Sequence, residues 1–455
     1  MSRLFGTDGV RGIANVNPMT AEMALAIGRA TAYVCKRHNR RHRIVIGKDT
    51  RLSCYMLENA LTAGICSMGV DVFLLGPVPT PGTAYITQSM RADAGIVISA
   101  SHNPYHDNGI KIFTRDGYKL SYRLEEEIED IIASGRINDI RPTAEEIGRA
   151  RRIDDAIGRY IVFCKQSFPQ QLTLDRMKIV LDCANGATYK VAPTVFQELD
   201  ADVTAIHNTP TGTNINQNCG SQHLGDLRRK VLETGADVGL AFDGDGDRLI
   251  AVDEKGNELD GDHIMAICAK HMLQQGTLGN RKVIITPMSN FGLRMSFDSL
   301  GITYEEADVG DRNVLELMQQ RGATLGGEQS GHIIFLNHHT TGDGIISALQ
   351  LLSILRQSGQ PLSELASIFK PAPQKLINID VPAKPPLESK PAILAAEQAA
   401  RAELGTKGRT LIRYSGTQAM CRVMVEGPTQ DMVDRIADML VNTVKQELCG
   451  SYKKA

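Results

Sequence analysis

The stretch Val238-Gly-Leu-Ala-Phe-Asp-Gly-Asp-Gly-Asp-Arg248 joins a short apolar run to a polar, glycine-bearing loop, and this arrangement recurs along the chain. Gly95-Ile-Val-Ile-Ser-Ala-Ser101 and Ala323-Thr-Leu-Gly-Gly-Glu328 have the same form. A short apolar run that ends in turn residues is typical of a buried strand. We therefore expect three strands, each of which leads into a polar loop.

Each of these three strands belongs to a longer unit, because two further β-rich runs and helical segments precede it. The first runs cover residues 43–47, 178–182 and 282–286, and the second runs lie near 71–75, 202–206 and 302–304. Strands that alternate with helices indicate βαβ units, in which ligands bind beyond the carboxyl ends of the strands. We therefore predict three related α/β domains with largely parallel, mixed sheets, and the three polar loops at the ligand-binding edges.

The last part of the chain has a different composition, since six of the 18 prolines lie within residues 371–391. Proline is excluded from helix interiors and central strands, so this segment predicts a domain boundary with an edge strand at 376–381. The other predicted elements are helices at 391–404 and 431–448, the latter with Met432, Ile436, Met439 and Leu440 at helical spacing, and strands at 410–413 and 422–425. We predict a C-terminal α+β domain. The predicted domains are 1–153, 154–255, 256–369 and 370–455.

Composition limits the class of protein. The chain has 455 residues, of which 42% are hydrophobic and 22% are charged, and its formal net charge is −2. This balance provides no positive field for nucleic acid or an anionic membrane. We find no apolar stretch long enough for a membrane-spanning helix, no secretory signal, and no CxxC pair among nine cysteines. We therefore expect a cytoplasmic protein that binds neither nucleic acid nor membranes.

Asp243, Asp245 and Asp247 place three carboxylates at alternate positions of one loop. Because these charges repel one another, a hard divalent cation, Mg²⁺ or Ca²⁺, is the expected ligand. With Glu254, the spacing also matches four positions of a calcium EF-hand loop. Arg248, however, stands at the invariant glycine position of that loop, and the flanks have the pattern of strands. We therefore favour a Mg²⁺ site that works alongside phosphates over an EF-hand or a solvated acidic turn.

Three further loops carry groups that suit a phosphorylated sugar. Ser99-Ala-Ser-His-Asn-Pro104 offers a hydroxyl and backbone N–H groups at a strand exit, although these residues also form ordinary turns. Gly326-Gly-Glu-Gln-Ser-Gly-His332 offers a carboxylate, a hydroxyl and an imidazole, with a plain loop as the alternative. Arg413-Tyr-Ser-Gly-Thr-Gln418 and Arg422 combine hydroxyls, backbone N–H groups and guanidinium forks, which suit a phosphate.

Taken together and in this order, the four loops and the opening Phe5-Gly-Thr-Asp-Gly-Val-Arg-Gly12 resemble the α-D-phosphohexomutase superfamily over essentially the whole chain. The opening segment and the motif Gly-Glu-Gln-Ser-Gly-His resemble most closely the bacterial members that act on glucosamine phosphates. The resemblance implies four domains arranged around a central active-site cleft. It also implies interconversion of glucosamine 6-phosphate and glucosamine 1-phosphate, on the route to UDP-N-acetylglucosamine and cell-wall precursors. A mutase for glucose or mannose phosphates is the alternative.

The resemblance further implies a phosphoserine mechanism. Ser101 would carry the phosphoryl group and pass it to the sugar through a glucosamine or glucose 1,6-bisphosphate, which serves as intermediate or activator. The implied ligands of one Mg²⁺ are Ser101, Asp243, Asp245 and Asp247. The other implied residues are Arg11, Lys111 and His332 at the transferring group, and Arg248, Gly310, Asp311, Glu328, Ser330, Arg413, Ser415, Gly416, Thr417 and Arg422 at the substrate. Either Lys111 or His332 is the implied general acid/base. The implied partners are small sugar phosphates, and a homodimer is left open.

Two positions depart from the family pattern. Gln418-Ala419 replaces Glu-Pro in the fourth loop, which removes a charge and a rigid residue, and Asn313 stands where a tyrosine is usual. We expect phosphate binding to survive, and the stiffness of the loop and a sugar contact to differ. Two other classes remain as alternatives, a phosphatase with the same nucleophile and a sugar-phosphate-binding protein. Ser101 and the three aspartates argue against the second, because binding alone requires neither.

Overall fold

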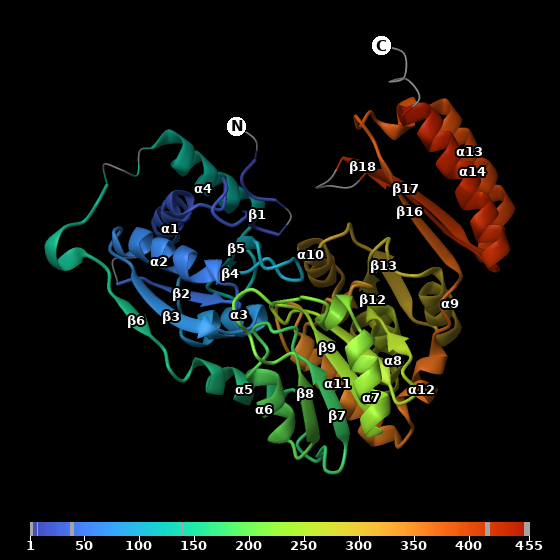
Figure 1. The fold of residues 1–455 in the computed structure, drawn as a ribbon, viewed down its shortest axis with the longest axis horizontal. Coiled ribbons are helices and arrows are strands. Elements are labelled where there is room, and N and C mark those ends of the chain that lie inside the picture. The colour runs from blue at the N-terminus through green and yellow to red at the C-terminus, as the bar shows by residue number, and fades with distance from the viewer. Residues whose placement is uncertain are drawn as a thin grey trace. The chain divides into compact units, whose positions relative to one another are not determined.

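The computed structural model of the chain describes residues 3–6, 8–36, 41–135, 137, 140–414 and 419–449. The chain forms two compact units. The first unit consists of Met1–Met288 and Gly301–Ile368, and the second of Ser289–Leu300 and Phe369–Ala455. The described part of the first unit contains three mixed β-sheets, and that of the second contains one antiparallel sheet (Figure 1).

The first sheet has six strands in the order β1-β5-β4-β2-β3-β6. These strands are β1 (Val10–Ile13), β2 (Arg43–Lys48), β3 (Asp71–Pro77), β4 (Ala94–Ile98), β5 (Asp107–Thr114) and β6 (Ala150–Arg152). β2 pairs in parallel with both β3 and β4, whereas β5 pairs with β4 in the antiparallel direction. The prediction of a largely parallel, mixed sheet is therefore confirmed here.

Helices cover both faces of this sheet (Figure 1). The helices are α1 (Ala21–Cys35), α2 (Ser53–Cys66) and α4 (Tyr122–Ser134) on one face, and α3 (Thr80–Ser89) and α5 (Ala156–Gln166) on the other. Successive side chains of a strand point to opposite faces. Ile44 and Ile46 of β2 accordingly join the first core, and Val45 joins the second. A strand that is buried on both faces must be apolar throughout, which explains the continuous apolar run.

The second and third sheets repeat this arrangement, with strand orders β11-β10-β9-β7-β8 and β13-β12-β14-β15. The strands are β7 (Lys178–Asp182), β8 (Asp202–Ile206), β9 (Val238–Phe242), β10 (Leu249–Asp253), β11 (Glu258–Leu259), β12 (Lys282–Ile285), β13 (Thr303–Glu306), β14 (Leu325–Gly327) and β15 (Ile333–Phe335). Their helices are α6 (Val191–Gln197), α7 (Gly225–Thr234), α8 (Gly261–Gln274), α10 (Asp311–Arg321), α11 (Gly344–Ser358) and α12 (Leu362–Leu365). In all three sheets the first strand of the repeat pairs in parallel with the second and the third. The three predicted α/β repeats are thus confirmed by their strand order.

The three polar loops occupy equivalent places in these sheets. Residues 99–106 connect β4 to β5, residues 243–248 connect β9 to β10, and residues 328–332 connect β14 to β15. Each loop begins at the carboxyl end of a parallel strand, where α/β sheets bind their ligands. An antiparallel strand follows each loop, and the sequence pattern indicated this strand only at residues 249–252.

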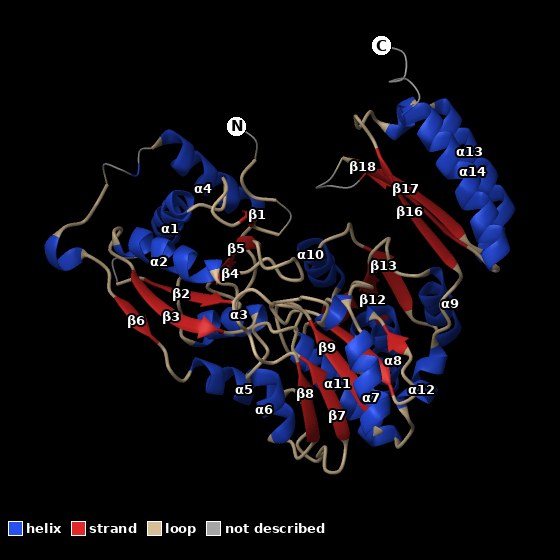
Figure 2. Cartoon of the chain, viewed as in Figure 1, coloured by secondary structure: helices blue, strands red, loops and turns tan. Residues whose placement is uncertain are grey.

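The described part of the second unit contains α9 (Phe291–Leu300) and a sheet with the order β16-β18-β17. The strands are β16 (Gln374–Asp380), β17 (Arg409–Tyr414) and β18 (Met420–Glu426), and the helices α13 (Pro391–Leu404) and α14 (Gln430–Cys449) pack on one face of the sheet (Figure 2). The predicted edge strand, both helices and both strands are confirmed. Met439, expected at helical spacing with the other apolar residues, is instead 39% exposed. The buried stripe of α14 passes through Ile436 and Leu440, and Met439 lies to the side of it.

α14, with 20 residues, carries its apolar side chains on one face. Among the residues that the structure describes, no helix combines the length and the apolarity required to span a bilayer.

Candidate active site

Ser101 is buried in the loop after β4, and its backbone lies in the left-handed region at φ 51°. Its hydroxyl donates to Asp243 Oδ2 at 2.5 Å, and its backbone N–H donates to Ser99 Oγ at 2.9 Å. A non-glycine residue held at positive φ costs about 1–3 kcal/mol and persists only where surrounding contacts determine it. The first polar loop therefore presents the Ser101 hydroxyl directly to the second polar loop.

Two side chains that the sequence analysis missed hold this loop in place. Arg51 Nη2 donates to the carbonyl oxygens of Ser101 and Asn103, both at 2.9 Å, and Nη1 donates to two further carbonyls of the same segment. Arg51 is fully buried, and Asp49 pairs with its Nε at 2.8 Å. Asn216, from the loop after β8, donates to the same two carbonyls at 2.9 and 3.0 Å. Loops of two different sheets therefore fix the Ser101 backbone.

Asp243, Asp245 and Asp247 are buried in the turn between β9 and β10, and one oxygen of each lies within 4.8 Å of the others. Burial and the neighbouring carboxylates raise the pKa of Asp243 well above its ordinary value. Oδ1 of Asp245 and Oδ1 of Asp247 are buried and have no hydrogen-bond partner among the described residues. Buried carboxylates with unsatisfied oxygens fit a hard cation that takes oxygen ligands. Ser101 Oγ lies in contact with this aspartate triad.

Lys111, which is buried in β5, provides positive charge at the triad. Its ammonium lies 2.9 Å from Asp245, 3.8 Å from Asp247 and 3.2 Å from Asp8. Burial lowers the pKa of an ammonium, but these carboxylates outweigh burial and raise the pKa of Lys111. A lysine held in this way stays charged, which suits a fixed cation better than a proton carrier. Thr80 Oγ1 donates to the same Asp245 Oδ2 at 2.6 Å.

Asp8 connects the opening segment to the site. It pairs with Arg11 and Lys119, and Lys119 also pairs with Asp311 at 2.5 Å. Burial raises the pKa of Asp8, but the three neighbouring cations lower it well below its ordinary value. Arg11 also donates to the carbonyl oxygen of Ala100, beside Ser101, at 3.4 Å. Arg11 and Asp311 were predicted from the sequence, whereas Asp8 and Lys119 were not.

His332 and Arg248 both lie beside Asp247 of the triad. Nδ1 of His332 is 3.5 Å from Asp247, and Nε2 is 3.8 Å from Asp311. Burial lowers the pKa of His332, but these two carboxylates raise it overall. Arg248 Nε is 3.8 Å from Asp247, and nearby carboxylates raise the pKa of this partly buried guanidinium against the effect of burial. The predicted residues of the first two polar loops thus meet those of the third.

Glu328, Ser330 and Gly310 form a polar group beside this site. Glu328 Oε1 accepts a hydrogen bond from the backbone N–H of Gly310 at 3.0 Å, and Oε2 accepts one from Ser330 Oγ at 3.4 Å. Gly310 has φ 126°, a conformation that residues with a side chain rarely adopt. The Glu328 carboxylate is therefore oriented from both sides, as a group that binds sugar hydroxyls requires.

Arg413 and Arg422 lie in the second unit as cross-strand partners on β17 and β18. Burial and the charge of Arg422 lower the pKa of Arg413. Like charges directly opposite each other destabilise a sheet, and a bound anion relieves this repulsion. The predicted phosphate ligands Ser415, Gly416 and Thr417 lie outside the described residues.

The sequence matches each of the four domains of one protein family. Domain I of phosphoglucomutase/phosphomannomutase matches residues 2–138, domain II residues 158–256, domain III residues 260–372, and the C-terminal domain residues 376–443. The chain therefore belongs to the phosphoglucomutase/phosphomannomutase family.

Curated relatives narrow this class to proteins named phosphoglucosamine mutase. The chain is 57% identical to that of Syntrophus aciditrophicus, over 98% of this chain and 100% of the relative. It is also 57% identical to that of Syntrophobacter fumaroxidans, over 98% and 99%, and to that of Geobacter sp. strain M21, over 100% of both chains. These matches cover the whole length of the relatives, or nearly so.

Solved structures share the fold. A phosphoglucomutase/phosphomannomutase family protein of Burkholderia thailandensis superposes with a TM-score of 0.80 at 24% identity, over 98% of this chain and 97% of that one. A putative phosphomannomutase of Thermus thermophilus has a TM-score of 0.77 at 20% identity, over 97% and 98%. An N-acetylphosphoglucosamine mutase of Aspergillus fumigatus, solved with GlcNAc-6P and magnesium, has a TM-score of 0.67 at 16% identity, over 98% and 96%.

Proposed function

We propose that this chain is a phosphoglucosamine mutase, which interconverts glucosamine 6-phosphate and glucosamine 1-phosphate through a phosphoserine at Ser101. The observation that carries the proposal is the hydrogen bond from Ser101 Oγ to Asp243, at the edge of a buried aspartate triad. Phosphoryl transfer requires little more of a protein than positioning and charge neutralisation, and this arrangement supplies both. The identity to proteins of that name supports the choice of an amino sugar.

The reaction consists of two phosphoryl transfers. In the first, the C1 hydroxyl oxygen of glucosamine 6-phosphate attacks the phosphorus on Ser101, the bond from phosphorus to Oγ breaks, and the hydroxyl proton passes to a base. The 1,6-bisphosphate then turns over within the site. In the second transfer, Ser101 Oγ attacks the phosphorus at C6, the C6 oxygen leaves and takes up the proton, and glucosamine 1-phosphate is released. No water is consumed. The site must exclude water, because hydrolysis of the phosphoserine would release inorganic phosphate in place of transfer to the sugar.

Asp243, Asp245 and Asp247 would hold one Mg²⁺ together with an oxygen of the Ser101 phosphate. When bound, this ion neutralises the charge of the phosphoryl group. Lys111 provides a fixed positive charge at the same place, because its ammonium bonds to Asp245. This division of roles makes Lys111 an electrostatic residue in the proposal and leaves proton transfer to another group.

His332 is the proposed proton carrier, because its Nε2 is buried and has no hydrogen-bond partner among the described residues. Glu328 and Ser330 are proposed to bind the sugar hydroxyls. Arg413 and Arg422 are proposed to bind the phosphate that does not react, and their cross-strand repulsion supports this. The other proposed contacts to the reacting phosphoryl group and the substrate are Arg11, Arg248, Gly310, Asp311, Ser415, Gly416 and Thr417.

A ³¹P NMR time course tests the proposed function. Purified protein with Mg²⁺ and a trace of hexose 1,6-bisphosphate is mixed with glucosamine 6-phosphate, and in a parallel sample with glucose 6-phosphate. The proposal predicts growth of a C1-phosphate signal, faster with the amino sugar. A faster reaction with glucose 6-phosphate would favour the phosphoglucomutase alternative. Growth of inorganic phosphate would identify a phosphatase, and no change with either sugar would contradict mutase activity.

A further inference from the structure

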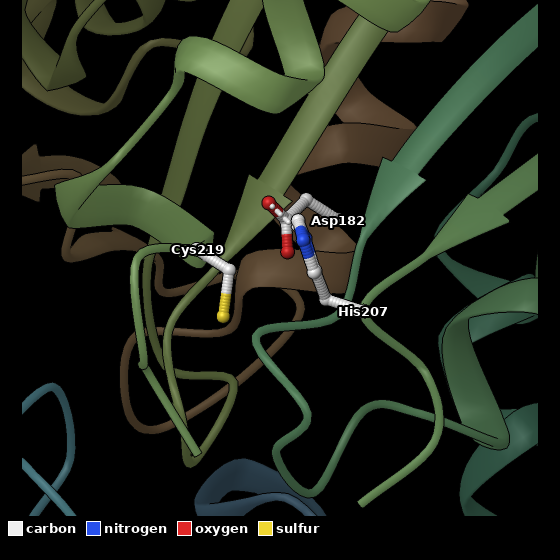
Figure 3. Close-up of side chains that lie close together, drawn as sticks. All are labelled: Asp182, His207 and Cys219. Carbon is white, nitrogen blue, oxygen red and sulfur yellow. Dashed lines mark hydrogen bonds and ion pairs between the residues drawn. The ribbon is translucent and has the colours of Figure 1, made fainter. Parts of the chain in front are cut away.

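Asp182, His207 and Cys219 meet at a place that no step of the proposed reaction uses (Figure 3). Asp182 is the last residue of β7, His207 follows β8, and Cys219 directly precedes a short 3-10 helix, Gly220–Gln222. One ligand atom of each side chain lies within 4.8 Å of the others. Asp182 and Cys219 are buried, whereas the His207 side chain is 23% exposed. The cluster is therefore preformed and has one side open to solvent.

We propose that this cluster is a second metal site, which binds Zn²⁺ through the Asp182 carboxylate, His207 Nδ1 and the Cys219 thiolate. Zinc takes these three donor types in four-coordinate sites, and sites that keep an open position have three protein ligands. The thiolate also separates this cluster from the aspartate triad, since sulfur ligands select zinc and oxygen ligands select magnesium. The fourth position would take a water molecule from the open side.

The surrounding groups orient two of the three ligands, His207 and Asp182. Asp226 Oδ2 lies 3.2 Å from His207 Nε2, and Asp182 Oδ2 lies 3.0 Å from His207 Nδ1. A carboxylate that accepts the Nε2 proton directs the Nδ1 lone pair at the ion, as in carboxylate–histidine–zinc arrangements. The backbone N–H groups of Gly220 and Ala184 donate to the two oxygens of Asp182, each at 2.9 Å. Asp182 is therefore fixed before any ion arrives.

Without an ion, the same geometry stabilises an imidazolium between two carboxylates. The hydrogen bond to Asp182 raises the pKa of His207 above its ordinary value, against the effect of burial. Burial and the neighbouring aspartates raise the pKa of the Cys219 thiol to about 12. Binding of Zn²⁺ must therefore release the thiol proton and the Nδ1 proton. The ion therefore competes with these two protons for the Cys219 sulfur and His207 Nδ1.

The position of the cluster connects it to the Ser101 loop. The segment between His207 and Cys219 contains Asn216, whose amide donates to the carbonyl oxygens of Ser101 and Asn103. An ion that joins His207 and Cys219 to Asp182 would fasten both ends of this segment to the second sheet.

A cobalt titration tests the proposal, because thiolate coordination to Co²⁺ produces a near-ultraviolet charge-transfer band. Reduced full-length protein is saturated with Mg²⁺ and titrated with Co²⁺ under anaerobic conditions, and Zn²⁺ is then added as a competitor. We expect one equivalent of Co²⁺ to produce the band and Zn²⁺ to remove it. Absence of the band, or a band that Zn²⁺ leaves unchanged, would overturn the proposal.

Variants identify the ligands. Cys219→Ser and His207→Gln are expected to lose the band, and Asp226→Asn to weaken Co²⁺ binding by about 10–100-fold. Two matched controls should keep the band. They are Cys66→Ser, in α2 outside the cluster, and Asp243→Asn, in the aspartate triad. Circular dichroism verifies that each variant is folded. A band that survives Cys219→Ser, or that disappears in either control, would contradict the assignment.

Discussion

The guanidinium of Arg51 donates to the carbonyl oxygen of Ser101 at 2.9 Å, and Asn216 donates to the same oxygen from another sheet. The bond joins the segment after β2 to the loop after β4, two neighbouring strands of the first sheet. Arg51 thereby holds the backbone on which the proposed phosphoserine depends. It touches no reacting atom and is a positioning residue.

Replacing Arg51 by lysine tests this role. Lysine keeps the positive charge beside Asp49 but loses the planar fork that binds several carbonyl oxygens at once. Misplacement of a reacting group by about 1 Å costs about 10²-fold in rate. We therefore expect Arg51→Lys to lower kcat by about 10²-fold while KM changes little, measured by a coupled assay of sugar 1-phosphate formation.

Arg356 provides the matched control for this substitution. Its guanidinium also donates to two backbone carbonyl oxygens, those of Thr173 and Asp175 at 2.9 and 3.0 Å, but at the protein surface. Arg356→Lys should leave turnover unchanged. Equal losses in the two variants would show that the effect of Arg51 is general destabilisation, and a fully active Arg51→Lys variant would exclude a positioning role.

Thr80 orients a carboxylate of the triad through its hydrogen bond of 2.6 Å to Asp245 Oδ2. Thr80→Val removes this bond with little change in volume. Loss of such an outer contact typically weakens metal binding by about 10–100-fold. We expect the Mg²⁺ concentration at half-maximal activity to rise by this factor. Thr87→Val, on the same helix, removes only a hydrogen bond to Thr83 O and should leave the Mg²⁺ dependence unchanged.

How much of this site the sequence predicts depends on the distance between partners along the chain. The three aspartates lie within five residues, so their mutual repulsion is visible in the sequence. Arg51, Asn216 and Thr80 bond to partners 50, 115 and 165 residues away, which no local pattern reveals. One signal was available for Arg51: Asp49-Thr-Arg51 directly follows β2, so it lies at the same carboxyl edge as the other polar loops.

Strands, like site residues, were predicted only where a local sequence pattern exists. Apolar runs such as residues 43–47 predict strands because both faces are buried. The antiparallel strands β5 and β15 escaped the sequence analysis. Residues 107–114 mix polar and apolar side chains, since Lys111 is buried at the site and Asn108 is buried against Ser53, and β15 has only three residues. Functional residues thus interrupted the pattern from which strands are predicted.

Asp343 predicts a dependence of stability on pH. Its carboxylate accepts hydrogen bonds from the N–H groups at the start of α11 and from Tyr160, and burial raises its pKa to about 6. A carboxyl whose pKa is raised by folding adds stability below its unfolded pKa and loses that contribution as pH rises through the folded pKa. The contribution amounts to about 2–3 kcal/mol.

The Asp343→Asn variant isolates this effect, because its amide does not titrate. The unfolding temperature of the parent protein minus that of the variant should fall as pH rises from about 4 to about 7. Thermal unfolding followed by circular dichroism in a series of buffers measures this difference. A constant difference over the series would show that Asp343 is ionised in the folded protein throughout.

Ser101→Ala should abolish turnover and leave binding of glucosamine 6-phosphate largely intact, because the alanine variant loses the nucleophile and keeps the groups proposed to bind the sugar. Isothermal titration calorimetry measures the binding, and the coupled assay measures turnover. Ser99→Ala is the matched control: it loses the hydroxyl that accepts from the Ser101 N–H, and it should reduce turnover without abolishing it. Undiminished turnover in Ser101→Ala would remove Ser101 from the mechanism.

The most direct test of the central claim is transfer of a phosphoryl group to and from Ser101. Dephosphorylated enzyme with Mg²⁺ is incubated with glucosamine 1,6-bisphosphate, freed of ligand, and examined by intact mass and peptide mapping before and after a chase with glucosamine 6-phosphate. The account predicts a gain of one phosphoryl group, mapped to Ser101, that the chase transfers to the sugar. A protein that gains no phosphoryl group, gains it at another residue, or loses it only as inorganic phosphate would contradict the account.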